Sequence, residues 1–198
     1  EAKAAVLAAK ENCDLPVLVT LIFDEKGKLL TGGTVDSTVA MLEGLRVDAL
    51  GVNCGLGPKQ MHPIIERLTQ VSSLPIIVNP NAGLPRSENG KTVFDIAPAE
   101  FSDLMEEIAG MGVQALGGCC GTTPEHLRLT IEKCRKVPFR PPVAKRRTVV
   151  SSFSQAVEIG PKPVIIGERI NPTGKSKFKA ALRENNIEYI LGEGMAQE

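Results

Sequence analysis

The chain has 198 residues, of which 42% are hydrophobic and 23% charged, and its 23 basic residues balance its 23 acidic ones. This composition predicts a globular protein with a sizeable core and excludes general disorder, which needs low hydrophobicity and high net charge. The charge balance leaves no basic surplus for nucleic acid, and no apolar run approaches the ~20 residues of a membrane span, so neither is an expected partner.

Four short apolar runs rich in β-branched residues predict the strands of a parallel sheet. None alternates polar and apolar residues, which is typical of strands covered on both faces. The runs are Leu15–Phe23, Val47–Cys54, Leu74–Asn79 and Val113–Cys119. A segment with helical periodicity follows each run, and three of these segments begin at a proline, which favours the first helical turn. The order predicts an α/β protein with four strand–helix units.

A repeated motif links two of these units. The pattern A-L-G-x-x-C-G-x-x-P occurs at 49–58 and again at 115–124. Each copy ends a strand in cysteine, turns on glycine and begins a helix at proline. Matching strand ends favour a (β/α) barrel over an open sheet, and a complete barrel needs ~250 residues, so four units predict half of one. Both ends of the chain read as helix interiors, and we expect a piece of a longer protein.

The character of the chain changes after Lys136. Residues 137–147 hold three prolines and four basic residues without periodicity, which predicts a linker. Beyond it, Val164–Asn171 predicts another buried strand, followed by a helix through Leu182. The predicted organisation is a first domain at 1–136, a linker at 137–162 and the start of a second domain at 163–198.

The five cysteines carry the strongest chemical signal. Their odd number and the adjacent pair argue against a disulfide framework and for metal or thiol chemistry in a reducing, cytoplasmic setting. Cys54 ends the second strand, and Cys119 and Cys120 end the fourth. The carboxyl ends of parallel barrel strands open on one face, so the three sulfurs are expected to converge. The alternative is that they are small buried apolar side chains, but the repeated motif favours a metal.

Three thiolates suit Zn²⁺ better than Mg²⁺ or Ca²⁺, and three protein ligands leave one coordination position free. Such a zinc is suited to bind a substrate thiol and to lower its pKa. The pattern therefore predicts an enzyme that alkylates a thiol. His62 and His126 each lie early in a helix near the same face; a histidine ligand is an alternative, and an ordinary structural role is favoured.

The sequence resembles the homocysteine S-methyltransferase family. The resemblance rests on G-V-N-C-G at 51–55, N-P-N-A-G-L-P at 79–85 and G-G-C-C-G-T-T-P-E-H at 117–126. It implies that Cys54, Cys119 and Cys120 bind catalytic zinc, and that residues 1–136 are the C-terminal half of a (β/α)₈ TIM barrel with homocysteine as substrate.

The same resemblance suggests further site residues. Asn81 lies in the middle motif and is a candidate fourth zinc ligand or substrate contact, with a turn role beside Gly83 as the alternative. Asn53 and Asn79 end strands at the same face and are candidate substrate-binding residues.

The tail I-G-E-R-I-N-P-T-G-K at 166–175 resembles the opening of the pterin-binding barrel in cobalamin-dependent methionine synthases. By that resemblance, Glu168 and Asn171 are candidate pterin contacts, although N-P-T-G also reads as a plain turn before a helix. The implied reaction methylates homocysteine with methylcobalamin, which 5-methyltetrahydrofolate regenerates. The implied partners are the missing barrel half and the cobalamin and folate domains, and we expect the isolated chain to be inactive.

Two alternatives remain open at this point. The chain could belong to a methyltransferase that uses another thiol or another methyl donor. It could also be a zinc-binding structural piece without turnover, whose open sheet edges pair with another chain.

Overall fold

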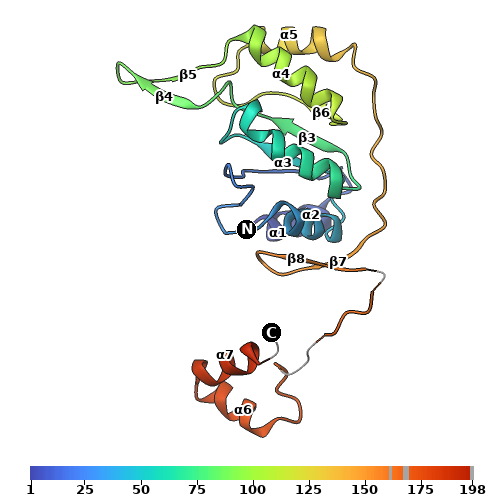
Figure 1. The fold of residues 1–198 in the computed structure, drawn as a ribbon, viewed down its shortest axis with the longest axis vertical. Helices are drawn as coiled ribbons and strands as arrows, with labels where there is room; N and C mark the ends of the chain where they lie inside the picture. The colour runs from blue at the N-terminus through green and yellow to red at the C-terminus, as the bar shows by residue number, and fades with distance from the viewer. Residues whose placement is uncertain (161, 167–169, 197–198) are drawn as a thin grey trace. The chain divides into compact units, whose positions relative to one another are not determined.

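The computed structural model describes residues 1–160, 162–166 and 170–196 and divides into two units, Glu1–Glu158 and Ile159–Glu198. Unit 1 contains a parallel sheet in the order β1-β2-β3-β6 (Figure 1). These strands are Leu18–Leu21, Ala49–Asn53, Ile76–Asn79 and Ala115–Leu116. The helices of this unit are α1 (Ala2–Asn12), α2 (Val35–Gly44), α3 (Pro58–Val71), α4 (Pro98–Gly110) and α5 (Pro124–Cys134).

The four predicted strand–helix units are confirmed, because each strand of the parallel sheet is followed by one of the helices α2 to α5. Parallel neighbours cannot be joined by a tight turn, so a crossover of this kind is required between them. The core lies between the sheet and these helices. Its members include Leu50, Val52, Ile76 and Val78 on the strands and Met61, Ile65, Phe101 and Met105 on the helices.

The expectation that all four strands are covered on both faces is wrong. Only β2 is buried along most of its length, whereas Leu18 of β1 is 59% exposed and Ala115 of β6 is exposed. β1 and β6 are the outer strands of the described sheet, and the helices cover one of its faces. An apolar run therefore marked a strand correctly without showing how much of it is covered.

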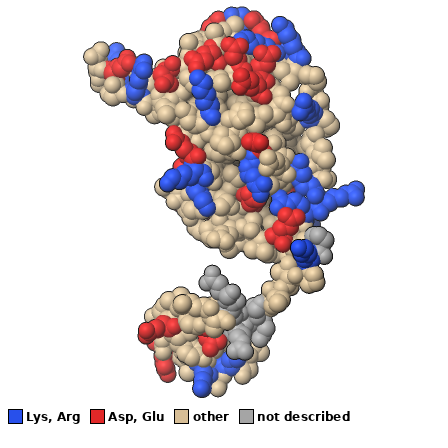
Figure 2. Space-filling view, in the orientation of Figure 1, with Lys and Arg blue, Asp and Glu red and all other residues tan. Residues whose placement is uncertain are grey.

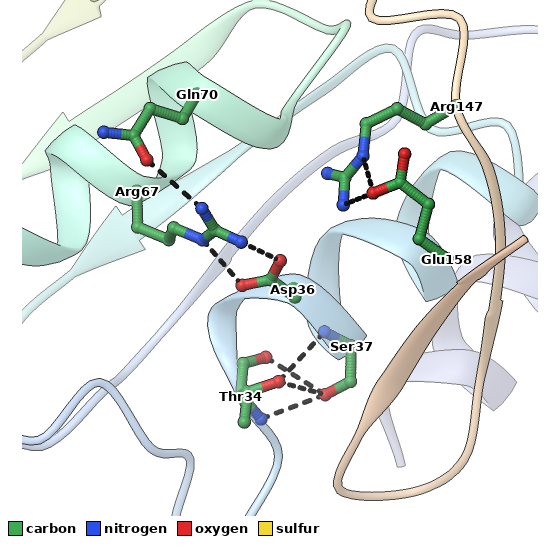
Figure 3. Close-up of polar contacts among 7 residues, drawn as sticks. All are labelled: Thr34, Asp36, Ser37, Arg67, Gln70, Arg147 and Glu158. Atoms are coloured by element: carbon green, nitrogen blue, oxygen red, sulfur yellow. Dashed lines mark hydrogen bonds and ion pairs between the residues drawn. The ribbon is translucent and has the colours of Figure 1, made fainter. Parts of the chain in front are cut away.

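The start of α2 shows how side chains tie unit 1 together (Figure 3). Thr34 and Ser37 form a capping box, in which each side chain accepts a hydrogen bond from the other residue's N–H, at 3.1 and 2.9 Å. In the same first turn, Asp36 accepts two hydrogen bonds from the Arg67 guanidinium of α3, at 2.9 and 2.5 Å. The cap satisfies helix N–H groups that have no partner within the helix, and the ion pair joins two neighbouring helices.

A β-hairpin that the sequence analysis did not anticipate follows β3. Its strands are β4 (Pro85–Glu88) and β5 (Lys91–Phe94), and it projects from the sheet in Figure 1. Asn89 and Gly90 form the turn with positive φ of 52° and 74°. Asn-Gly is the preferred dipeptide for this two-residue turn, so the signal was present in the sequence.

The stretch expected as a linker contains ordered structure that belongs to unit 1. The extended segment (residues 137–147) runs along the end of the sheet opposite to the β4–β5 hairpin (Figure 1). Gln114 donates to the carbonyl of Arg140 at 2.8 Å, and the Lys145 N–H donates to Ser73 Oγ at 3.0 Å. The chain then forms the hairpin of β7 (Thr148–Ser151) and β8 (Ala156–Ile159), and β7 packs against α2.

Unit 2 contains the helices α6 (Ser176–Arg183) and α7 (Ile187–Met195). They pack through Phe178, which is buried, and Tyr189, with ring centroids 6.4 Å apart. The buried strand expected at Val164–Asn171 does not form in the described residues: 163–166 are irregular, and Ile165 is 98% exposed. A strand needs a neighbour for its backbone hydrogen bonds, and no described residue pairs with this segment.

Charged side chains lie on the outer faces of the helices. Figure 2 shows acidic side chains gathered over α4 and α5, where Asp103 pairs with Lys133 and Glu125 pairs with Arg128. This arrangement follows from amphipathic helices that turn their apolar side toward the sheet. Within the described residues, no helix combines the length and the apolar character that crossing a membrane requires.

Candidate metal centre

Three loops at the carboxyl end of the sheet form the candidate site. Cys54 follows β2, Asn81 follows β3, and the two adjacent cysteines follow β6. The middle loop is hydrogen bonded to both neighbours, because the Asn81 N–H donates to the Leu56 carbonyl at 3.0 Å and the Cys119 N–H donates to the Pro80 carbonyl at 2.8 Å. The parallel sheet therefore brings together segments that are distant in the sequence and holds their backbones side by side.

The three cysteine sulfurs converge at this edge. Cys54 Sγ lies 3.7 Å from Cys120 Sγ, and Cys119 Sγ lies 3.9 Å from Cys120 Sγ. All three lie within 4.8 Å of one another, and among the described residues they are the one such group of three or more histidine, cysteine or acidic side chains. Cys120 is exposed and the other two are partly exposed, so a small molecule can reach them.

The sulfur spacing fits a tetrahedral zinc ion. Zn–S bonds are about 2.3 Å long, so two sulfurs of a tetrahedral site lie about 3.8 Å apart. Two of the three separations, at 3.7 and 3.9 Å, lie on either side of that value, and the third, between Cys54 and Cys119, is within 4.8 Å. Three thiolates with a free fourth position are the ligand set of an open zinc site, whereas structural zinc sites close all four positions.

The backbone at both cysteine loops has the conformation that this convergence requires. Cys54 and Gly55 both lie in the left-handed region, with φ of 56° and 74°, and this turns the chain sharply at the end of β2. Gly121, which follows the cysteine pair, has φ of 80°, and a Cβ there would lie 2.3 Å from the ring of Phe94. The β4–β5 hairpin therefore lies directly against the cysteine loop.

Asn81 is 3% exposed and contacts both cysteine loops. Its Oδ1 accepts a hydrogen bond from the Cys120 N–H at 3.1 Å, and its side chain also hydrogen bonds to the Cys54 thiol. The structure thus brings Asn81 to the sulfurs, as a residue that joins the two loops.

The cysteine thiols differ in how readily they ionise. Burial, and then the hydrogen bonds with the other two thiols, raises the pKa of Cys119 to about 11. Burial also disfavours the Cys54 thiolate, but hydrogen bonds from the Gly55 N–H, the other two thiols and Asn81 outweigh it, and the pKa of Cys54 is lowered. Of these two, Cys54 ionises first, and Cys119 must release a proton when a metal binds.

The other candidate residues fall into two groups. Asn53 and Asn79 are direct partners in the β2–β3 ladder, so their side chains leave the sheet on the same face, opposite to the core-facing Val52 and Val78. The candidate pterin contacts lie in unit 2. Asn171 is exposed, and its Oδ1 accepts the Thr173 N–H at 2.9 Å in a local turn, whereas Glu168 lies outside the described residues.

The comparison with known families matches residues 1–134 to homocysteine S-methyltransferase. The chain belongs to the homocysteine S-methyltransferase family. It is 32% identical to methionine synthase of Mycobacterium leprae (strain TN) and 30% identical to methionine synthase of Mycobacterium tuberculosis, over 96% of the chain in both cases. The chain spans only 17% and 16% of the length of these two relatives.

Solved structures show the same fold. The metallated form of the homocysteine methyltransferase MmuM from Escherichia coli superposes with a TM-score of 0.54 at 23% identity, over 68% of this chain and 40% of that one. The oxidized form of MmuM gives 0.53 at 24% identity, over 68% and 41%. The homocysteine S-methyltransferase part of the chain is therefore a partial TIM-barrel-like α/β fold, in agreement with the sequence.

His126 is a residue whose contacts the sequence analysis did not anticipate. It is 5% exposed, and both of its ring nitrogens are hydrogen bonded, one to the Thr123 N–H and the other to the Ile96 carbonyl. One signal was available, because His126 stands three residues after the helix cap Thr123, where a side chain can bond back to the cap.

Proposed function

We propose that the chain carries the zinc-binding half of a domain that transfers a methyl group to the sulfur of homocysteine and so forms methionine. The observation that carries the proposal is the convergence of the Cys54, Cys119 and Cys120 sulfurs at separations suited to zinc. Membership of the homocysteine S-methyltransferase family supports homocysteine as the thiol.

The chain's own residues would bind and orient the reactants. A zinc ion held by the three cysteines would lower the pKa of a fourth, incoming sulfur, so that the substrate thiol ionises at neutral pH. Asn81 joins the two cysteine loops and is also the candidate for a fourth ligand or substrate contact. Asn53 and Asn79 lie together at the same edge of the sheet, and we assign them to the polar groups of homocysteine.

The methyl donor is proposed to be methylcobalamin, regenerated from 5-methyltetrahydrofolate on parts of the protein outside this chain. The support is that the methionine synthases match 96% of the chain, including the part beyond the family match at residue 134. On this proposal residues 1–136 belong to the homocysteine-binding domain, 137–162 connect it to the next domain, and 163–198 begin a pterin-binding domain in which Glu168 and Asn171 contact the pterin.

The metal assignment is tested by zinc content. We expect the purified chain to hold one zinc ion, and a Cys119→Ser/Cys120→Ser variant to hold none, when both are measured by mass spectrometry of the metal. Cys13→Ser is the matched control, because Cys13 is exposed and lies outside the three-sulfur group. Equal zinc in the wild-type chain and the double variant would refute the site.

The reaction is tested by measuring methionine formation from homocysteine and free methylcobalamin. The mass of the chain in solution is measured at the same time, so that any turnover is assigned to a monomer or to an associated form. Little turnover is expected from the chain alone, because substrate contacts from the rest of the barrel are absent. Addition of the remaining barrel half should raise the rate, and the double cysteine variant should remove that gain. A rate that the cysteine substitutions leave unchanged would contradict the proposal.

A further inference from the structure

His126 is a buried histidine close to the cysteine loop but outside the sulfur group. Its Nδ1 accepts the Thr123 N–H at 3.2 Å and lies 2.8 Å from the Thr123 hydroxyl, and its Nε2 lies 3.0 Å from the Ile96 carbonyl. A backbone N–H can only donate, so Nδ1 is the acceptor and Nε2 carries the proton that it donates to Ile96. Both nitrogens are thus occupied, which leaves no lone pair for a metal.

The Ile96 carbonyl connects this ring to the cysteine pair through the neighbouring loop. The Ile96 N–H donates to the Ala82 carbonyl at 3.0 Å, and the Ala82 N–H donates to the Cys120 carbonyl at 2.9 Å. Thr123 follows Cys120 by three residues, so these hydrogen bonds form a closed circuit. It runs from Cys120 to Ala82, on to Ile96, through the His126 ring to Thr123, and back along the chain to Cys120. His126 is the one side chain in that circuit.

The orientation of the ring is itself held. Phe101 of α4 packs against it edge-on, with centroids 5.3 Å apart and an interplanar angle of 83°. Phe101 and Ser102 are fully buried at the start of α4, so the part of α4 that faces the His126 ring belongs to the core. A rigid ring with two opposed hydrogen bonds fixes the distance between the start of α5 and the chain at Ile96.

We propose that His126 is a positioning residue of the metal centre, which holds the Cys119–Cys120 loop in register with the loop after β3 so that both adjacent sulfurs face one ion. This inference rests on the zinc site proposed above. The atoms that bind a metal must be held to within about 0.5 Å of their ideal positions for tight binding. Loss of a hydrogen bond that supports the ligands from outside the coordination sphere typically costs about 10–100-fold in metal affinity. His126 acts here through the backbone of the loop and does not touch the ion.

Two substitutions separate the two hydrogen bonds of the ring. The short amide of His126→Asn can accept from the Thr123 N–H, as a helix cap requires, but cannot reach Ile96. The longer amide of His126→Gln can donate to the Ile96 carbonyl in place of Nε2. His62→Asn is the matched control, because His62 is exposed and also lies early in a helix.

The experiment measures the zinc dissociation constant of the 198-residue chain by competition with a chromophoric chelator. We expect His126→Asn to bind zinc about ten-fold more weakly, His126→Gln to recover most of the wild-type affinity, and His62→Asn to be unchanged. With Co²⁺ in place of zinc, the Asn variant should also show shifted d–d absorption bands, which report coordination geometry and which a change in stability alone does not move.

The inference is overturned if His126→Asn binds zinc as tightly as the wild-type chain, or if the Gln variant is as weak as the Asn variant. Should the Asn variant not fold, the Gln variant alone decides, and affinity more than ten-fold below wild type would overturn the inference. A wild-type chain that holds no zinc would instead refute the metal site itself, and this inference with it.

Discussion

Asp36 and Arg67 form a two-bond ion pair that joins α2 to α3, and Gln70 accepts a further hydrogen bond from the same guanidinium (Figure 3). The hydrogen bonds from Arg67 outweigh the effect of burial and lower the pKa of Asp36. The carboxylate is only partly exposed, with 26% of its side-chain surface accessible, so solvent screens the pair less than it would at an open surface.

We expect Asp36→Asn to reduce the free energy of unfolding by roughly 1 kcal/mol at pH 7. Because the folded-state pKa of Asp36 lies below its unfolded value, its contribution is complete above the unfolded pKa and is lost as the pH falls through the lowered one. Urea unfolding at pH 7 and near pH 2 should therefore show a difference between wild type and variant that shrinks in acid. A constant difference would contradict this assignment.

At the scale of elements, the extended segment and the β7–β8 hairpin behave as parts of unit 1. Gln114 accepts the Ile76 N–H at 2.8 Å and donates to the Arg140 carbonyl, so one side chain ties β3 and the start of β6 to the extended segment. The Thr34 N–H, at the start of α2, also donates to the backbone carbonyl of Ser154, in the turn of the β7–β8 hairpin, at 3.3 Å. These contacts lie at the amino ends of β3, β6 and α2.

A chain shortened to residues 1–136 should therefore be less stable than one shortened to 1–158. Loss of the Gln114–Arg140 and Ser73–Lys145 hydrogen bonds alone is worth about 2 kcal/mol, at about 1 kcal/mol for each bond. The urea midpoint, measured by far-ultraviolet circular dichroism, is expected to be lower for the shorter chain. Identical midpoints would show that the segment is a passive connection.

At the scale of the whole molecule, every residue placed in the metal centre belongs to unit 1, and the candidate pterin contacts belong to unit 2. The regular structure in the described part of unit 2 is a pair of helices, and its buried apolar side chains are Phe178 and Ala181. Two helices bury too little apolar surface to be stable alone, whereas unit 1 has a continuous core.

A chain of residues 1–158 is thus expected to bind zinc with the affinity of the full chain. A difference of up to about three-fold in the dissociation constant, which is under 1 kcal/mol, counts as the same affinity. Chelator competition on both chains measures this directly, with the Cys119→Ser/Cys120→Ser substitutions in the shorter chain as the control. Weaker binding by the shorter chain would mean that unit 2 supports the cysteine loops.

The sequence by itself determined the four strand–helix units of the parallel sheet and the cysteines and Asn81 of the candidate site. Apolar runs, prolines at helix starts and the repeated cysteine motif are local signals, and local patterns decide where strands and helices form. The same patterns did not predict the β4–β5 hairpin or its packing against Gly121, although the Asn89–Gly90 dipeptide that favours such a turn stands in the sequence. They also predicted a strand at Val164–Asn171 that has no partner among the described residues.

Only the tertiary structure decided how the site is held together. The sulfur separations depend on the pairing of β2, β3 and β6, and the circuit through His126, Ile96 and Ala82 joins segments up to 44 positions apart. Such contacts form between residues that no local pattern relates, because hydrogen bonds and packing across a parallel sheet are made only once its crossovers are closed.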